Sequence, residues 1–107
     1  MKFELHDAIK ILERTPHVLR VFLSDLPEQW IRMNEGSETW SAFDIVGHLI
    51  HGEKTDWIPR MMIIMHEDVK RFTPFDRFAQ FRESEGKILQ DLLTEFADLR
   101  KRSIEIL

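Results

Sequence analysis

Apolar residues recur at spacings of three and four along most of the chain, which is the period of an amphipathic helix. This pattern predicts three long helices over residues 3–25, 41–66 and 78–106, and no segment alternates in the manner of a β-strand. We therefore expect an all-α fold, an antiparallel helical bundle that forms a single domain over residues 1–107.

Prolines and one capping sequence refine these helices. The pair Thr15-Pro16 favours a helix start, so the first helix is expected to kink or restart near residue 15. Ser41, followed three residues later by Asp44, predicts a capping box at the start of the second helix. Pro59 removes one backbone hydrogen bond, which predicts a bend between residues 57 and 61. Before the third helix, phenylalanines recur at every third position, and this aromatic connection is expected to pack on the bundle.

The composition excludes several classes of protein. Of the 107 residues 43% are hydrophobic and 32% are charged, which suits a folded chain rather than a disordered one. The net charge of −4 provides no positive field for DNA or RNA, so no nucleic-acid partner is expected. The absence of cysteine excludes disulfides and thiolate ligands and suits a reducing, cytoplasmic location. No signal peptide and no apolar run of membrane-spanning length is present, so we expect no membrane partner.

The candidate chemistry lies on the second predicted helix. At about 100° per residue, Asp44, His48, His51 and Thr55 fall within a stripe roughly 60° wide. Imidazole nitrogens bind zinc and nickel, and a nearby carboxylate can orient such a ring or complete the site. His48, His51 and Asp44 are therefore the candidate ligands of a divalent metal. We expect His48, which has apolar residues on either side, to face the bundle interior, and His51 to be more exposed and at most a secondary ligand.

A simpler interpretation of the same stripe is a polar, solvent-facing surface. An apolar side lies opposite it, as on any amphipathic helix, and consists of Phe43, Val46, Leu49, Ile50 and Trp57. Glu53 and Asp56 flank the histidines, but in a chain with 19 carboxylates a solvated pair is the preferred interpretation. The helix also contains Gly47 and Gly52, which indicate a close helix approach or room at a site.

The stretch from Glu35 to Arg60, with its Trp40-Ser41 opening and the later His48-Leu49 pair, resembles the start of the second helix in the DinB/YfiT-like family. The resemblance covers what would be the N-terminal two-thirds of such a protein. It implies an incomplete four-helix bundle. Many members of this family bind a divalent metal through three histidines, and some are hydrolases or thiol-dependent transferases, so the resemblance also implies such a metal and such an activity. Only His48 matches one of these ligands, because the later His-x-x-x-His pair of the family is absent from this sequence.

Two classes of function remain open. One is a metal-dependent enzyme in which His48, with His51 and Asp44, forms part of a site that another chain or a further segment completes. The other, which the sequence favours, is a non-catalytic helical module that self-associates. A bundle lacking one helix leaves an apolar groove, which we expect to be lined by Leu89, Leu92, Leu93, Phe96 and Leu99 with Phe22 and Leu23. A two-fold homodimer would cover this groove, and exchange of the third helix is one way to form it. The alternative is a three-helix monomer in which the kinked first helix and the aromatic connection from Phe72 to Phe81 fold over the groove.

Overall fold

The computed structural model describes residues 2–66 and 71–107. Within these residues the chain is entirely helical and contains no strand, which confirms the all-α prediction. The helices are α1 (Leu5–Leu23), α2 (Glu28–Arg32), α3 (Ala42–Thr55), α4 (Trp57–His66), α5 (Ala79–Glu83) and α6 (Leu89–Ile106).

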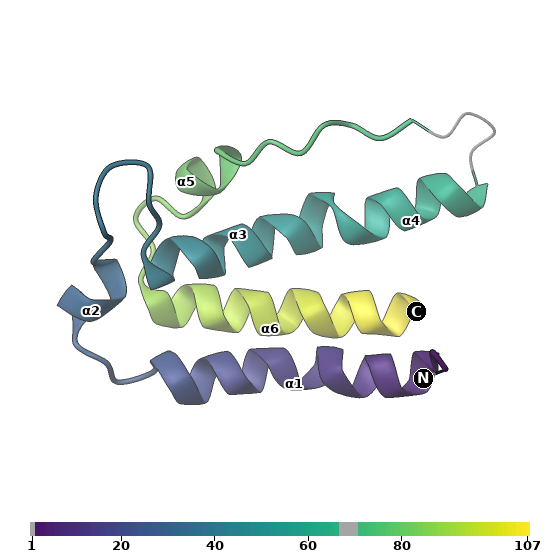
Figure 1. The fold of residues 1–107 in the computed structure, drawn as a ribbon, viewed down its shortest axis with the longest axis horizontal. Coiled ribbons are helices and arrows are strands. Elements are labelled where there is room, and N and C mark those ends of the chain that lie inside the picture. The colour runs from purple at the N-terminus through teal and green to yellow at the C-terminus, as the bar shows by residue number, and fades with distance from the viewer. Residues whose placement is uncertain (1, 67–70) are drawn as a thin grey trace.

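The three long parts of the bundle lie side by side, with α6 between α1 and the α3–α4 pair (Figure 1). α1 runs antiparallel to α6, but α3, α4 and α6 all run in the same direction, so the prediction of fully antiparallel helices is wrong. The reason is the aromatic connection: residues 71–78 lead back along α4 and α3 to α5, and α6 therefore starts at the same end as α3. A long crossover of this kind allows neighbouring helices to be parallel.

The core lies where α3, α6 and the C-terminal end of α1 meet. Its buried residues are Leu23, Ile31, Phe43, Val46, Ile50, Leu92, Leu93 and Phe96. The predicted apolar side of the second helix is thus confirmed for Phe43, Val46 and Ile50, whereas Trp57 is 62% exposed because it begins a separate helix.

The prediction of an open apolar groove is wrong for most of the residues that were expected to line it. Leu92, Leu93 and Phe96 are at most 2% exposed because they form the chain's own core. Several apolar side chains on the outer side of α1 are exposed instead, among them Phe22, which is 74% exposed. None of the described helices combines the length and apolar character that a membrane crossing requires.

α1 continues through Pro16 without a break, so the expected restart near residue 15 does not occur. Proline has no N–H to donate to the carbonyl oxygen of Leu12, one turn earlier, which would leave that oxygen without its helical partner. The side chain of Arg100 on α6 supplies the missing donor, with Nη1 3.1 Å from Leu12 O. This contact satisfies the freed carbonyl group and ties α1 to α6.

The second predicted helix is divided at Asp56, whose φ of −106° and ψ of −68° end α3. The break precedes the expected bend at 57–61 because Pro59 lies in the first turn of α4, where backbone N–H groups have no helical acceptor. At the other end of α3 the predicted capping box is confirmed. Asp44 N donates to Ser41 Oγ over 3.1 Å, and Ser41 N donates to the Asp44 carboxylate over 3.0 Å.

The third predicted helix is also two helices, α5 and α6. Gly86 separates them with a φ of +78°, a left-handed conformation that glycine adopts without steric cost. α6 then begins beside Asp91, whose carboxylate accepts a hydrogen bond from the backbone N–H of Ile88 over 3.1 Å. Because the chain turns between the two helices, α5 does not continue the line of α6 and packs across α3.

Candidate functional site

The side chain of Gln80, on α5, fixes the orientation of the His48 ring. Gln80 is 1% exposed, and its Nε2 donates a hydrogen bond to the backbone oxygen of Asp44 over 2.8 Å. Its Oε1 therefore faces His48 Nδ1, 3.2 Å away. Because an amide oxygen can only accept, Nδ1 of His48 carries the proton, and the lone pair of the neutral ring is on Nε2.

His51 lies one turn further along α3 and has a carboxylate as its partner. Its Nδ1 is 3.1 and 3.2 Å from the two carboxylate oxygens of Glu83. A carboxylate accepts a hydrogen bond from Nδ1–H, so Nε2 is again the nitrogen left for a ligand. The expectation that His51 is the more exposed ring is wrong. His51 is 4% exposed, whereas His48 is only half-buried.

Aromatic side chains cover both imidazoles. The Phe75 ring lies 5.4 Å from the His48 ring and 5.0 Å from the His51 ring, in edge-on orientations. The Trp40 ring lies 5.0 Å from His48 on the preceding loop. The aromatic connection thus packs on the bundle through Phe75, which is half-buried, while Phe72, Phe78 and Phe81 remain at least 40% exposed.

Two local features hold α5 against α3. The Cα of Gly47 lies so close to α5 that a Cβ there would be 2.8 Å from Ser84 Oγ, which confirms the expected close helix approach. Before α5, the Asp76 carboxylate accepts hydrogen bonds from the backbone N–H groups of Phe78 and Ala79. The bond from Phe78 in particular, with help from the side chain of Arg82, holds the pKa of Asp76 below its ordinary value.

Asp44, the third residue predicted from the sequence, serves the helix rather than the imidazoles. Its carboxylate is occupied by the capping box, and its backbone oxygen accepts the Gln80 hydrogen bond. Within residues 2–66 and 71–107, no group of three or more histidine, aspartate or glutamate side chains is placed to hold a metal ion. The site therefore consists of two oriented imidazoles, each with its Nε2 left for a ligand or a proton.

A second polar group, which was expected to be solvated, is buried. Nε and Nη2 of Arg100 both donate to Glu53 Oε1, over 3.1 and 2.9 Å, and the two side chains are 11% and 3% exposed. Spacing could have indicated this pair, because Arg100 lies four residues after Phe96 and Glu53 lies seven after Val46, each on its apolar stripe. Asp56 is also largely shielded from solvent: its side chain is 16% exposed and pairs with Arg60 over 2.8 Å.

Comparison with known proteins identifies no relative from which a function could be inferred. The chain matches no model of a known protein family and no curated protein sequence.

Proposed function

We propose that His48 and His51 form the protein's part of a divalent-metal site that supports a hydrolase or transferase reaction. The observation that carries this proposal is the pair of acceptors on α5, Gln80 Oε1 and Glu83, that meet the Nδ1 atoms of the two rings. Histidines that bind metals generally donate their other ring N–H to such an acceptor, which fixes the tautomer and raises the basicity of the ligating nitrogen. A solvent-facing polar stripe, the simpler interpretation, would not require a glutamine that is only 1% exposed behind one ring.

The metal would be zinc or nickel, the ions that imidazole ligands suit best. A catalytic site of this kind takes three protein ligands and one open position, and a metal bound there polarises a carbonyl group or activates a water molecule. His48 and His51 would supply two of these ligands. The remaining ligand would therefore come from a second chain or from a segment outside the described residues.

Metal titration tests the proposal. Isothermal titration with Zn²⁺ and Ni²⁺ is expected to show binding to the wild-type chain that is lost in both His48→Ala and His51→Ala. His17→Ala is the matched control, since His17 is an exposed histidine on α1 for which the expected effect is nil. Gln80→Leu should weaken binding by about 10- to 100-fold because it removes only the orienting acceptor. Equal binding by the wild-type, His48→Ala and His51→Ala chains would refute the proposal.

A separate observation favours self-association as a second function. The outer side of α1 carries an apolar strip on which Ile11, Val18, Val21 and Phe22 are 56–74% exposed. These positions lie beside the core-facing side of α1, so the helix is apolar over a wider arc than α6 covers. We propose that a second copy of the chain covers this strip, because one self-complementary face satisfies both protomers of a two-fold dimer.

Sedimentation equilibrium distinguishes a dimer from a monomer. The wild-type chain is expected to sediment at twice its chain mass at micromolar concentration, and Phe22→Ser at the mass of one chain. Phe78→Ser, which changes a phenylalanine that is 59% exposed elsewhere, should remain a dimer. A wild-type chain that sediments as a monomer would contradict this second function.

A further inference from the structure

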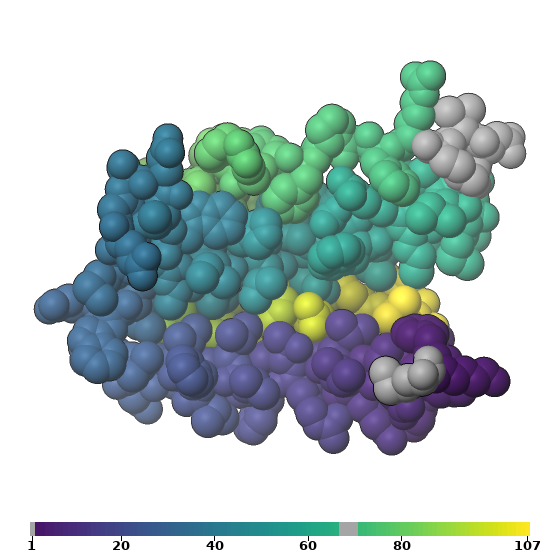
Figure 2. Space-filling view, viewed as in Figure 1, coloured from purple at the N-terminus to yellow at the C-terminus, as the bar shows by residue number. Residues whose placement is uncertain are grey.

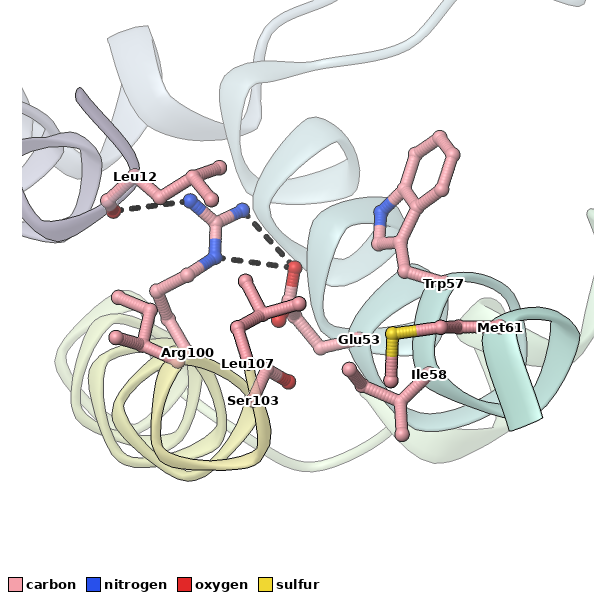
Figure 3. A pocket seen from close by; sticks show the side chains of 9 residues that line it. Leu12, Glu53, Trp57, Ile58, Met61, Arg100, Ser103 and Leu107 are labelled. Carbon is pink, nitrogen blue, oxygen red and sulfur yellow. Dashed lines mark hydrogen bonds and ion pairs between the residues drawn. The ribbon is translucent and has the colours of Figure 1, made fainter. Parts of the chain in front are cut away.

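A cavity lies at the end of the bundle where α1, α4 and α6 meet. It has a volume of about 370 Å³ and lies beside the Glu53–Arg100 pair, not beside the two imidazoles. In the space-filling view, α6 (yellow) forms the floor between α4 (teal) and α1 (purple) in this region (Figure 2). The close-up shows Trp57, Ile58 and Met61 on one side and Leu12 and Arg100 on the other (Figure 3).

The walls of this cavity are apolar. Leu12, Trp57, Ile58, Met61, Ile104 and Leu107 supply most of its surface. Apolar cavities of about 150 Å³ hold a molecule the size of benzene, so this one has room for a molecule of two fused rings. A pocket of this size with apolar walls and a few polar atoms is typical of a small-molecule site.

Three polar residues line the cavity, Glu53, Arg100 and Ser103, and the carboxylate oxygen that Arg100 leaves to a ligand is Glu53 Oε2. Both hydrogen bonds from Arg100 go to Oε1, and no described residue donates one to Oε2. The Glu53 side chain is 3% exposed, so Oε2 is nearly excluded from bulk water. A ligand that brings an O–H or N–H group would give this oxygen a charge-assisted hydrogen bond, which is stronger than a bond between neutral groups.

The charge of the site selects an uncharged ligand. The guanidinium group of Arg100 already balances the Glu53 carboxylate, and all contacts between them are shorter than 3.2 Å. A cationic or an anionic ligand would add an unbalanced charge to a poorly solvated place. We propose that this cavity binds a small, mainly apolar, uncharged molecule whose single O–H or N–H group donates to Glu53 Oε2.

A matched pair of probes tests the requirement for a donor. 2-Naphthol has two fused rings and one O–H, and 2-methoxynaphthalene has the same rings without the donor. Followed by two-dimensional ¹H–¹⁵N NMR, titration of the wild-type chain is expected to show at least about tenfold tighter binding of 2-naphthol, since hydrogen bonds to charged groups are strong. The shifted amide signals should belong to residues of α4 and the C-terminal half of α6. Equal affinities of the two probes, or shifts confined to the imidazole site, would overturn the proposal.

A filled cavity provides a second test. Met61→Trp places a larger side chain in the cavity and should abolish 2-naphthol binding. Met65→Trp makes the same change at a methionine that is 63% exposed outside the cavity, and it should leave binding unchanged. Binding that survives Met61→Trp would show that the probe binds elsewhere. If Met61→Trp does not fold, the position of the shifted signals in the wild-type spectrum decides.

Discussion

Removing the Glu53 carboxylate, as in Glu53→Ala, leaves the guanidinium group of Arg100 buried without its counter-ion. The pair is 3% and 11% exposed, and two of the three guanidinium nitrogens donate to Glu53. Breaking a buried pair by removing one partner costs about 3–5 kcal/mol. A chain of this size has a free energy of unfolding of about 5–15 kcal/mol, so the substitution should consume a large part of it.

The double variant Glu53→Leu with Arg100→Met separates the charge from the packing. Replacing both partners with apolar residues removes the uncompensated charge, so the double variant should be more stable than Glu53→Ala. It should still lose about 1–3 kcal/mol, because the carbonyl oxygen of Leu12 loses the hydrogen bond that Arg100 donates to it beside Pro16. Adding Pro16→Ala restores a backbone N–H at that position and should recover part of this loss.

Urea unfolding followed by circular dichroism measures these differences for all four chains. A matched control is Glu105→Ala, since Glu105 is an exposed glutamate on α6 and its loss should change the free energy of unfolding by less than about 0.5 kcal/mol. A loss below about 1 kcal/mol for Glu53→Ala, or a double variant less stable than that single variant, would refute the reasoning.

Three further predictions concern the cap, the core and α5. Ser41→Ala should cost about 1 kcal/mol in urea unfolding, because α3 loses its side-chain N-cap. Phe96→Ala should cost about 3–5 kcal/mol because Phe96 is fully buried, whereas Phe78→Ala should cost less than about 0.5 kcal/mol. NMR titration should place the pKa of Asp76 below its ordinary 3.8. The pKa of Asp76 is lower in the folded chain than in the unfolded chain. The stability that Asp76 adds is therefore present above its unfolded pKa and is lost as the pH falls through the folded pKa. Asp76→Asn should remove this pH dependence.

The helical periods and the capping box could be predicted from the sequence because both depend on residues close together in the chain. Ser41 and Asp44 are three residues apart, and their reciprocal hydrogen bonds follow from local geometry. The same local reasoning gave a wrong prediction at Pro16, where it placed a restart of the first helix. α1 continues through Pro16, and the carbonyl oxygen that the missing N–H leaves free accepts a hydrogen bond from Arg100, 88 positions away from Leu12 in the sequence.

The partners of the two histidines could not be predicted for a similar reason. Gln80 and Glu83 each lie 32 positions after the imidazole that they orient. They reach it because the aromatic connection returns along α4 and because Gly86 ends α5 before α6 begins. No periodic pattern within α3 indicates that His51 is the more buried ring, since the groups that contact it, Glu83 and Phe75, lie outside α3.

The protonation of the His48 ring tests the central claim of this account most directly. Long-range ¹H–¹⁵N NMR spectra distinguish the two neutral tautomers of each imidazole at about pH 8.5, well above the usual histidine pKa. The hydrogen bond to Gln80 predicts the proton on Nδ1 of His48 and the lone pair on Nε2, and Gln80→Leu should abolish this preference. A proton found on Nε2 of His48 in the wild-type chain would contradict the account, because the nitrogen proposed to bind a metal would then have no free lone pair.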